Sequence, residues 1–263
     1  MSLKLEFESA NGDRIQGIFV EDTQHIVRDF PYLPGDKYVI TTDHPGQFVY
    51  VQLDAALSPA LVYVKQTKWE YQIPFDFQKE SPYAPGAFSG KRHYAWAKFA
   101  DQTQIAGERD LALNSHDQHE LSGAFPHAES NSETRGESVF FAKNAIDGVL
   151  ANEYHGNYPH QSWGPEETGD TWLKLDFGRE VIVSQIRGLF RADFPHDGVW
   201  QSAKVEFSDG SQQLISPIHS DELQKFPVDH IKTSTLKLFD LDRTGSENEF
   251  HALSELVVLG TEL

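Results

Sequence analysis

The sequence contains no cysteine among its 263 residues, so no disulfide bond stabilises it. This excludes the small secreted scaffolds that depend on disulfides. No apolar run approaches the ~20 residues of a membrane-spanning helix, and none near the N-terminus suits a signal peptide. We therefore expect a soluble protein that is cytoplasmic as the sequence stands, or extracellular if the native N-terminus has been trimmed.

Clusters of positive charge are also missing. Lys and Arg number 22 against 40 Asp and Glu, which gives a net charge of −18. Such a surface repels phosphate backbones and anionic lipids, so neither nucleic acids nor membranes are expected partners. Neutral carbohydrates and cations remain compatible with this charge. The oligomeric state does not follow from the composition.

Common catalytic motifs are absent as well: there is no cysteine nucleophile, phosphate-binding loop, dinucleotide fingerprint or Gly-x-Ser-x-Gly elbow. The string His-Asp-Gln-His-Glu at 116–120 has the spacing of two metal-binding histidines on one helix face. Its neighbours Asn114-Ser115 and Ser122-Gly123 are typical of a loop, where this spacing defines no geometry. The sequence therefore favours a non-enzymatic protein.

Apolar residues recur with a period of two, which indicates β-strands. Residues 4–8 alternate, reach Asn11-Gly12 and return through Ile15 and Phe19, the pattern of a hairpin with a positive-φ turn. Further strands are predicted at 38–42, 48–53, 60–65 and 93–99, and residues 67–92 are interpreted as a long loop or irregular sheet edge. Residues 101–109 are polar and lack a strong period, so we place a domain boundary near Arg109.

The second half continues the pattern, with strands predicted at 172–177, 181–190, 203–207, 236–241 and 256–259. Only residues 138–146 and 221–225 are predicted to form short helices. Many short strands separated by turn residues are typical of β-sandwiches. The predicted class is all-β, with one β-sandwich domain of unassigned role at 1–109 and a second at 110–263.

Several strings in residues 110–263 occur in a recognisable order. They are Asn-Ala-Ile-Asp-Gly at 144–148, Trp163, Trp-Leu-Lys-Leu-Asp-Phe-Gly at 172–178, Phe-Ser-Asp-Gly-Ser at 207–211 and Ser-Glu-Leu-Val-Val-Leu-Gly at 254–260. Together they resemble the discoidin, or coagulation-factor type C, family of galactose-binding-like β-sandwiches. The resemblance implies a jelly roll that binds carbohydrate, and it does not extend to residues 1–109.

The resemblance also implies a structural calcium ion between the first loop of this domain and its last strand. The matching side chains are Asp147, Asn152 and Glu255, and Asn144 would contribute its backbone carbonyl. Calcium takes six to eight oxygen ligands, which carboxylates, amides and carbonyls supply. The alternative is that Asp147 is a turn residue and Glu255 an exposed edge charge.

Sugar sites of this family lie on loops at one end of the sandwich, where an aromatic ring stacks on the sugar and polar side chains bind its hydroxyls. Polar and aromatic residues are densest here at 155–163 and 191–200. The predicted ligand-binding residues are His160, Trp163, Arg191, Asp193, His196, Asp197 and Trp200. In the alternative interpretation the two tryptophans cap the core, and the residues from Arg191 to Asp193 form a loop salt bridge.

Two other functions remain open. A β-sandwich glycoside hydrolase or polysaccharide lyase would use His196 or His160 with Arg191, and Asp193 or Asp197 as acid or base. A protein-interaction module would instead present a broad apolar surface. We expect a protein that recognises a neutral mono- or oligosaccharide, with calcium as its structural ion.

Overall fold

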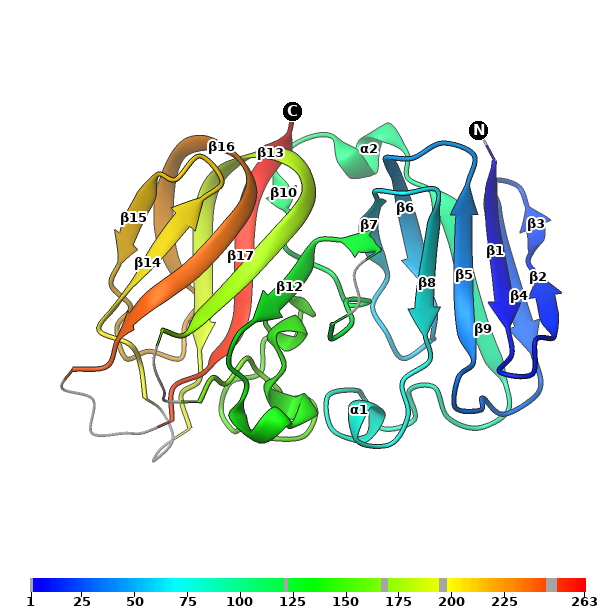
Figure 1. The fold of residues 1–263 in the computed structure, drawn as a ribbon, viewed down its shortest axis with the longest axis horizontal. Coiled ribbons are helices and arrows are strands. Elements are labelled where there is room, and N and C mark those ends of the chain that lie inside the picture. The colour runs from blue at the N-terminus through cyan, green and yellow to red at the C-terminus, as the bar shows by residue number, and fades with distance from the viewer. Residues whose placement is uncertain (1, 121–122, 167–169, 194–197, 245–249) are drawn as a thin grey trace.

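The computed structural model describes residues 2–120, 123–166, 170–193, 198–244 and 250–263 (Figure 1). Within them the regular structure is almost entirely strand, and neighbouring strands in all three sheets are antiparallel. The only α-helices in these ranges, α1 (Phe77–Glu80) and α2 (Gln102–Ile105), have four residues each. The predicted all-β class is therefore confirmed. No helix in the described ranges is long and apolar enough to cross a membrane.

Two sheets make up the N-terminal half and enclose one hydrophobic core. The first has the order β2 (Arg14–Gln16), β1 (Leu3–Glu8), β5 (Lys37–Thr42), β8 (Lys68–Gln72). The second has the order β11 (Ala124–Phe125), β7 (Ala60–Val64), β6 (Gln47–Gln52), β9 (His93–Phe99), β4 (Thr23–Arg28), β3 (Ile18–Val20).

The predicted hairpin is present as β1 and β2, with Phe7 opposite Ile15 and Gly12 in the turn at a φ of 87°. Alternate residues of β1 are buried, which is the period-two pattern seen in the sequence. Strand β8 lies inside residues 67–92, where only a loop or irregular edge was expected. Its alternation is short, and its pairing with β5 completes the sheet.

The C-terminal half encloses a second core within one seven-stranded sheet. Its order is β10 (Arg109–Asp110), β17 (Leu253–Glu262), β13 (Trp172–Phe190), β16 (Gln224–Asp242), β14 (Ser202–Phe207), β15 (Gln212–Ile215), with β12 (His127–Ser130) paired to β13.

Strands β13 and β16, of 19 residues each, bend over the core (Figure 1). Each of them therefore contributes to both of the layers that enclose the core. The first part of β13 pairs with β12, and the second part pairs with β17. Gly178 lies at the bend with a φ of 71°, and a Cβ there would come within 2.5 Å of the Phe125 ring. Glycine is the residue that meets both conditions. Two strands predicted from the sequence, 172–177 and 181–190, are thus one bent strand.

The predicted helix at 221–225 is wrong, because β16 begins at Gln224 and pairs with β13. Gln224 also exchanges two hydrogen bonds between its side chain and the backbone of Ile218, which fixes an extended turn. The other predicted helix is present as short 3-10 turns, η2 (Ser138–Phe140) and η3 (Ala142–Ile146). A further turn, η1 (Thr134–Gly136), precedes them.

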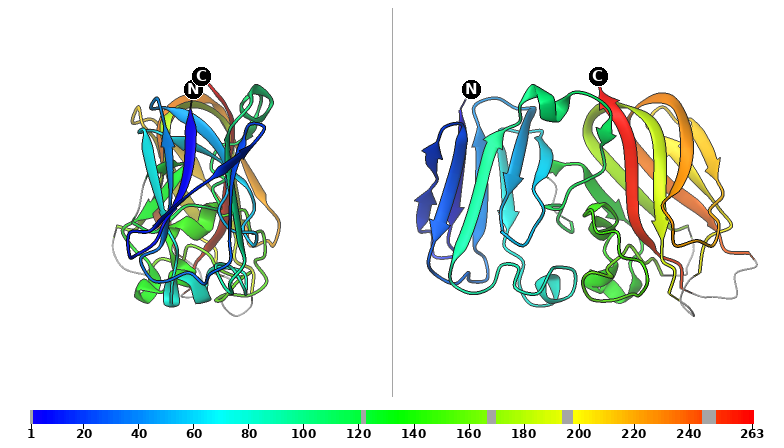
Figure 2. Two further views of the ribbon diagram at one scale, coloured as in Figure 1. Left: turned by 90° about the vertical axis from the view of Figure 1, so that its right-hand side faces the viewer. Right: turned by 180° about the vertical axis from the view of Figure 1, so that it is seen from behind.

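The two halves meet through the segment that follows β10. His116 is buried, and its Nε2 accepts a hydrogen bond from the backbone N–H of Leu53 at 3.0 Å. Strand β11 then returns to pair with β7 of the N-terminal half before β12 joins the C-terminal sheet. Because residues after Arg109 still pair with the N-terminal half, the domain boundary placed at Arg109 from the sequence stays a prediction. The two chain ends point to the same long side of the molecule, the upper side in Figure 2, each on its own half.

Candidate functional site

A small cavity lies at the end of the C-terminal sandwich where β13 finishes and β17 begins. Its volume is about 160 Å³, which is below the ~300–1,000 Å³ of drug-sized ligand pockets. Turns η1 and η2, two loops, and the residues flanking β13 and β17 contribute to it. The lining residues are Thr134, Arg135, Phe140, His155, Gly164, Pro165, Arg191, Phe250 and His251.

Asp193 holds the two main polar side chains of this cavity. One of its oxygens forms an ion pair with Arg191 Nε at 2.8 Å, and the other lies 2.5 Å from His155 Nδ1. Arg191 also donates a hydrogen bond from Nη2 to the Phe250 carbonyl at 3.1 Å. A buried guanidinium is costly without a partner, so Asp193 both offsets its charge and fixes its orientation.

The structure brings together two of the sequence-predicted residues, Arg191 and Asp193, and the loop salt bridge between them is present. His160 does not line the cavity. Its Nδ1 lies 4.0 Å from Glu153, and its ring packs edge-on against Tyr154. His196 and Asp197 lie outside the described residues.

Trp163 and Trp200 are core side chains, with exposed fractions of 0% and 1%. Their rings lie 5.9 Å apart, and Trp163 Nε1 donates a hydrogen bond to Ser130 Oγ. This corrects the expectation that one of them stacks on a sugar, because burial leaves no ring face for a ligand. Trp200 instead supports the site from below, since the cavity-lining His251 stacks on it at 5.8 Å.

Of the nine lining residues the sequence predicted only Arg191, and the missed residues include His155, Phe250 and His251. His155 lies within the predicted 155–163 cluster, so its loop was found but the wrong histidine was chosen. Phe250 and His251 are about sixty residues from Arg191 in sequence and carry no local signal. Phe250, 47% exposed, places an aromatic side chain at the cavity.

The residues proposed for calcium lie on the buried side of the same loops. Glu255 Oε1 accepts a hydrogen bond from Gly148 N–H at 3.1 Å, which brings Glu255 beside Asp147. Burial raises the pKa of Asp147 to about 6. Burial and the Asp147 charge raise the pKa of Glu255 well above its usual value. Both carboxyl groups are therefore destabilised as anions.

The two asparagines are also buried, and their amide groups are engaged. Asn144 Nδ2 donates to the Ser138 carbonyl at 2.9 Å, and Asn152 Nδ2 donates to the Phe190 carbonyl at 2.9 Å. The described residues contain no group of three or more His, Cys, Asp or Glu side chains placed for a metal ion. The predicted set holds only two carboxylates, so its other ligands would be amide and carbonyl oxygens.

The two histidines of residues 116–120 make structural contacts. His116 is in the junction between the halves, and His119 pairs with Glu133 at 2.8 Å while its ring stacks on Phe141. Hydrolysis of a glycosidic bond by paired carboxylates needs two acidic groups beside the substrate. Among the described residues that line the cavity there is neither Asp nor Glu.

No family model matches the chain, and no curated protein matches it. Solved structures show partial likeness. The family 32 carbohydrate-binding module of NanJ from C. perfringens, in complex with galactose, shares 18% identity over 58% of this chain and 99% of that chain, with a TM-score of 0.42. A fucose-binding module of Streptococcus pneumoniae shares 15% identity over 57% of this chain and 96% of that chain, with a TM-score of 0.42.

A third structure, the fucolectin of striped bass (Morone saxatilis) serum, shares 13% identity over 92% of this chain and 86% of that chain, with a TM-score of 0.46. All three are carbohydrate-binding proteins by description. Likeness at these scores does not assign a ligand to this chain, so its function rests on its own residues.

Proposed function

We propose that the C-terminal half is a discoidin-like module that binds a neutral sugar in the cavity beside Arg191. The observation that carries the proposal is the Arg191–Asp193–His155 cluster, in which one buried carboxylate orients two polar side chains at the cavity. Sugar hydroxyls both donate and accept hydrogen bonds, and oriented groups bind them at a low entropic cost. The exposed Phe250 ring offers an apolar surface for the C–H face of a sugar.

The charge and the size of the cavity restrict the class of ligand that it can bind. Asp193 balances Arg191, and the other cavity arginine, Arg135, is paired with Glu137 at 2.6 Å. The cavity therefore offers no uncompensated arginine to attract an anion. At about 160 Å³ it accommodates a single small unit, such as a monosaccharide or the terminal residue of a glycan.

The test uses His155→Ala with His160→Ala as the matched control, because both histidines lie in one loop and only His155 lines the cavity. We expect a neutral monosaccharide from a panel that includes galactose and fucose to bind the wild type, measured by isothermal titration calorimetry. Loss of an oriented hydrogen-bonding group costs about 1.4 kcal/mol, so His155→Ala should weaken binding about tenfold. Equal affinities for the two variants, or no binding by the wild type, would contradict the proposal.

We also propose that calcium binds at Asp147, Glu255 and the Asn152 side chain, with the backbone carbonyl of Asn144 as a further oxygen ligand. Glu255 Oε2 is buried and has no hydrogen-bond partner among the described residues. A cation there would supply the missing partner and stabilise both buried carboxyl groups in their anionic form. The ion would hold the loop that follows η3 against strand β17, and it would take no part in binding the sugar.

Calcium is expected to raise the unfolding temperature of the wild type near neutral pH. Saturation at a hundred times the dissociation constant stabilises a protein by about 2.7 kcal/mol, which corresponds to several degrees. Glu255→Gln should abolish this response, whereas Glu180→Gln, an exposed change on β13, should retain it. Scanning calorimetry with calcium, magnesium or EDTA measures the effect, and an unchanged melting temperature with calcium would refute the site.

A further inference from the structure

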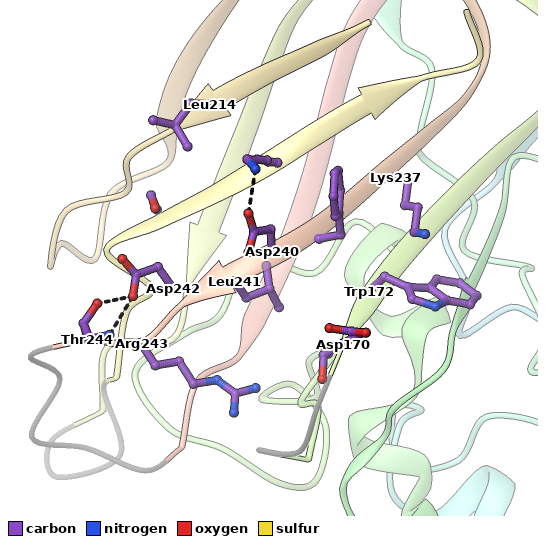
Figure 3. A pocket seen from close by; sticks show the side chains of 13 residues that line it. Asp170, Trp172, Leu214, Lys237, Asp240, Leu241, Asp242, Arg243 and Thr244 are labelled. Carbon is purple, nitrogen blue, oxygen red and sulfur yellow. Dashed lines mark hydrogen bonds and ion pairs between the residues drawn. The ribbon is translucent and has the colours of Figure 1, made fainter. Parts of the chain in front are cut away.

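A groove lies on the outer face of the C-terminal sheet (Figure 3), and it shares no lining residue with the cavity beside Arg191. Its volume is about 1090 Å³, at the upper end of the range for ligand pockets. Strands β13, β14, β15 and β16 form its floor. The lining residues are Asp170, Thr171, Trp172, Ser202, Lys204, Leu214, Lys237, Phe239, Asp240, Leu241, Asp242, Arg243 and Thr244.

Strand alternation puts large apolar side chains on this outer face. Leu173 and Leu238 point into the core, so their neighbours Trp172 and Phe239 point outward. Trp172 lies opposite Phe239 on the adjacent strand, Phe239 lies opposite Lys204, and Lys204 lies opposite Leu214. With strands ~4.8 Å apart, this row of four side chains extends roughly 14 Å across the sheet.

Lys204 is the charged member of this row, and the other charged side chains of the groove lie around it. Lys237 Nζ lies 5.3 Å from the Trp172 ring centre and 5.5 Å from that of Phe239. Among the described residues no carboxylate pairs with Lys237, whereas Lys204 forms an ion pair with Asp240 at 2.8 Å (Figure 3). Trp172 and Phe239 are only partly buried, and Leu214 is 61% exposed. The Trp172 and Phe239 rings and the Leu214 side chain, with the aliphatic stem of Lys204 between them, form an open and largely apolar strip, which is unusual on a surface unless something binds it.

The lining charges balance, since the three cations Lys204, Lys237 and Arg243 face three aspartates, Asp170, Asp240 and Asp242. Positively charged donors and negatively charged acceptors lie along the strip. This combination suits a neutral ligand that is rich in hydroxyl groups and apolar on its ring faces. A strongly charged ligand would find as many like charges as opposite ones.

We propose that this groove binds an internal stretch of a neutral oligosaccharide chain, with sugar rings packed on Trp172 and Phe239. The inference deepens the proposed function and rests on it for the ligand class. The cavity beside Arg191, at about 160 Å³, has room for one unit, whereas the groove, at about 1090 Å³, has room for several. The protein would thus recognise a chain at two places, one for a terminal sugar and one for the chain itself.

The experiment is calorimetric titration of the full chain with mono- to hexasaccharides of the gluco, xylo and galacto series. In the wild type the affinity for at least one series should rise about tenfold or more from mono- to hexasaccharide. Trp172→Ala and Phe239→Ala should remove this rise and leave monosaccharide affinity within about twofold of wild type. Trp172→Tyr, which keeps an aromatic ring, should retain part of it.

Glu180→Ala is the matched control, because Glu180 is an exposed residue of β13 that does not line the groove, and its loss should leave the dependence on chain length unchanged. Lys237→Met removes the charge and keeps the aliphatic stem, so it tests the groove without deleting a ring. Circular dichroism and thermal unfolding verify that each variant is folded.

Affinity independent of chain length, or a length dependence that survives Trp172→Ala and Phe239→Ala in folded protein, would overturn the groove proposal. Monosaccharide binding that remains sensitive to His155→Ala would then still support the cavity site. Conversely, chain binding that requires Trp172 but is indifferent to His155→Ala, without monosaccharide binding, would support the groove and refute the cavity.

Discussion

Asp193→Ala is expected to lower the free energy of unfolding by about 3–5 kcal/mol and to abolish sugar binding at the cavity. The substitution removes the Asp193 carboxylate from the Arg191 guanidinium, which is 4% exposed, and from the His155 ring. Removing one member of a buried ion pair typically costs this much, because the remaining charge is uncompensated. Thermal unfolding should show a decrease of roughly 6–20 °C.

The double variant Arg191→Ala/Asp193→Ala separates this cause from general damage to the loop. Since it removes both charges, it should be more stable than the sum of the two single changes predicts. Asp193→Asn, which keeps the shape of the side chain, should bind sugar more weakly than wild type while losing less stability than Asp193→Ala. Strictly additive losses in the double variant would show that Asp193 does not act through Arg191.

Acidification is expected to destabilise the junction between the two halves through His116. Its Nε2 accepts the Leu53 N–H, while Nδ1 lies 3.0 Å from Ser115 Oγ, which donates to the Ser58 carbonyl. This arrangement requires a neutral ring, and burial lowers the pKa of His116 to about 3. Protonation removes the acceptor for Leu53 and places a charge in the core.

The direction follows from the two pKa values. The unfolded pKa of histidine is ~6.5, so between pH 6.5 and 3 the unfolded state binds more protons and stability falls as the pH falls. The stabilisation is complete above pH 6.5, and about 3 kcal/mol of it should be lost by pH 4.5. Urea unfolding at a series of pH values measures the slope.

His116→Gln should be less stable than wild type at pH 7 and should show a shallower decrease below pH 6.5. The control is His44→Gln, because this side chain is 68% exposed in the wild type and its partner Asp43 also lies at the surface. If His116→Gln and wild type have the same pH slope, the buried histidine does not titrate as described.

Much of the fold follows from local rules that act over a few residues. The alternation in residues 4–8 and 172–177 depends only on the two-residue period of a strand, and Gly12 marks a turn that favours glycine. Arg191 and Asp193 were found because they are close in sequence and follow a strongly apolar strand. Strand β8 and the start of β16 were missed, because their extended conformation depends on partners distant in the chain.

The candidate site also depends partly on local sequence rules and partly on contacts between distant segments. The sequence alone determined an all-β chain, an acidic surface, and the loop that carries Arg191 and Asp193. Only the tertiary structure decided that His155, 38 residues from Asp193, completes the cluster, and that Trp163 and Trp200 are core residues. The reason is physical: alternation specifies which side chains leave a strand on which face, whereas the meeting of loops depends on how two bent strands close the sandwich. That closure buries the tryptophans beneath the cavity and brings His251 and Phe250 to its edge.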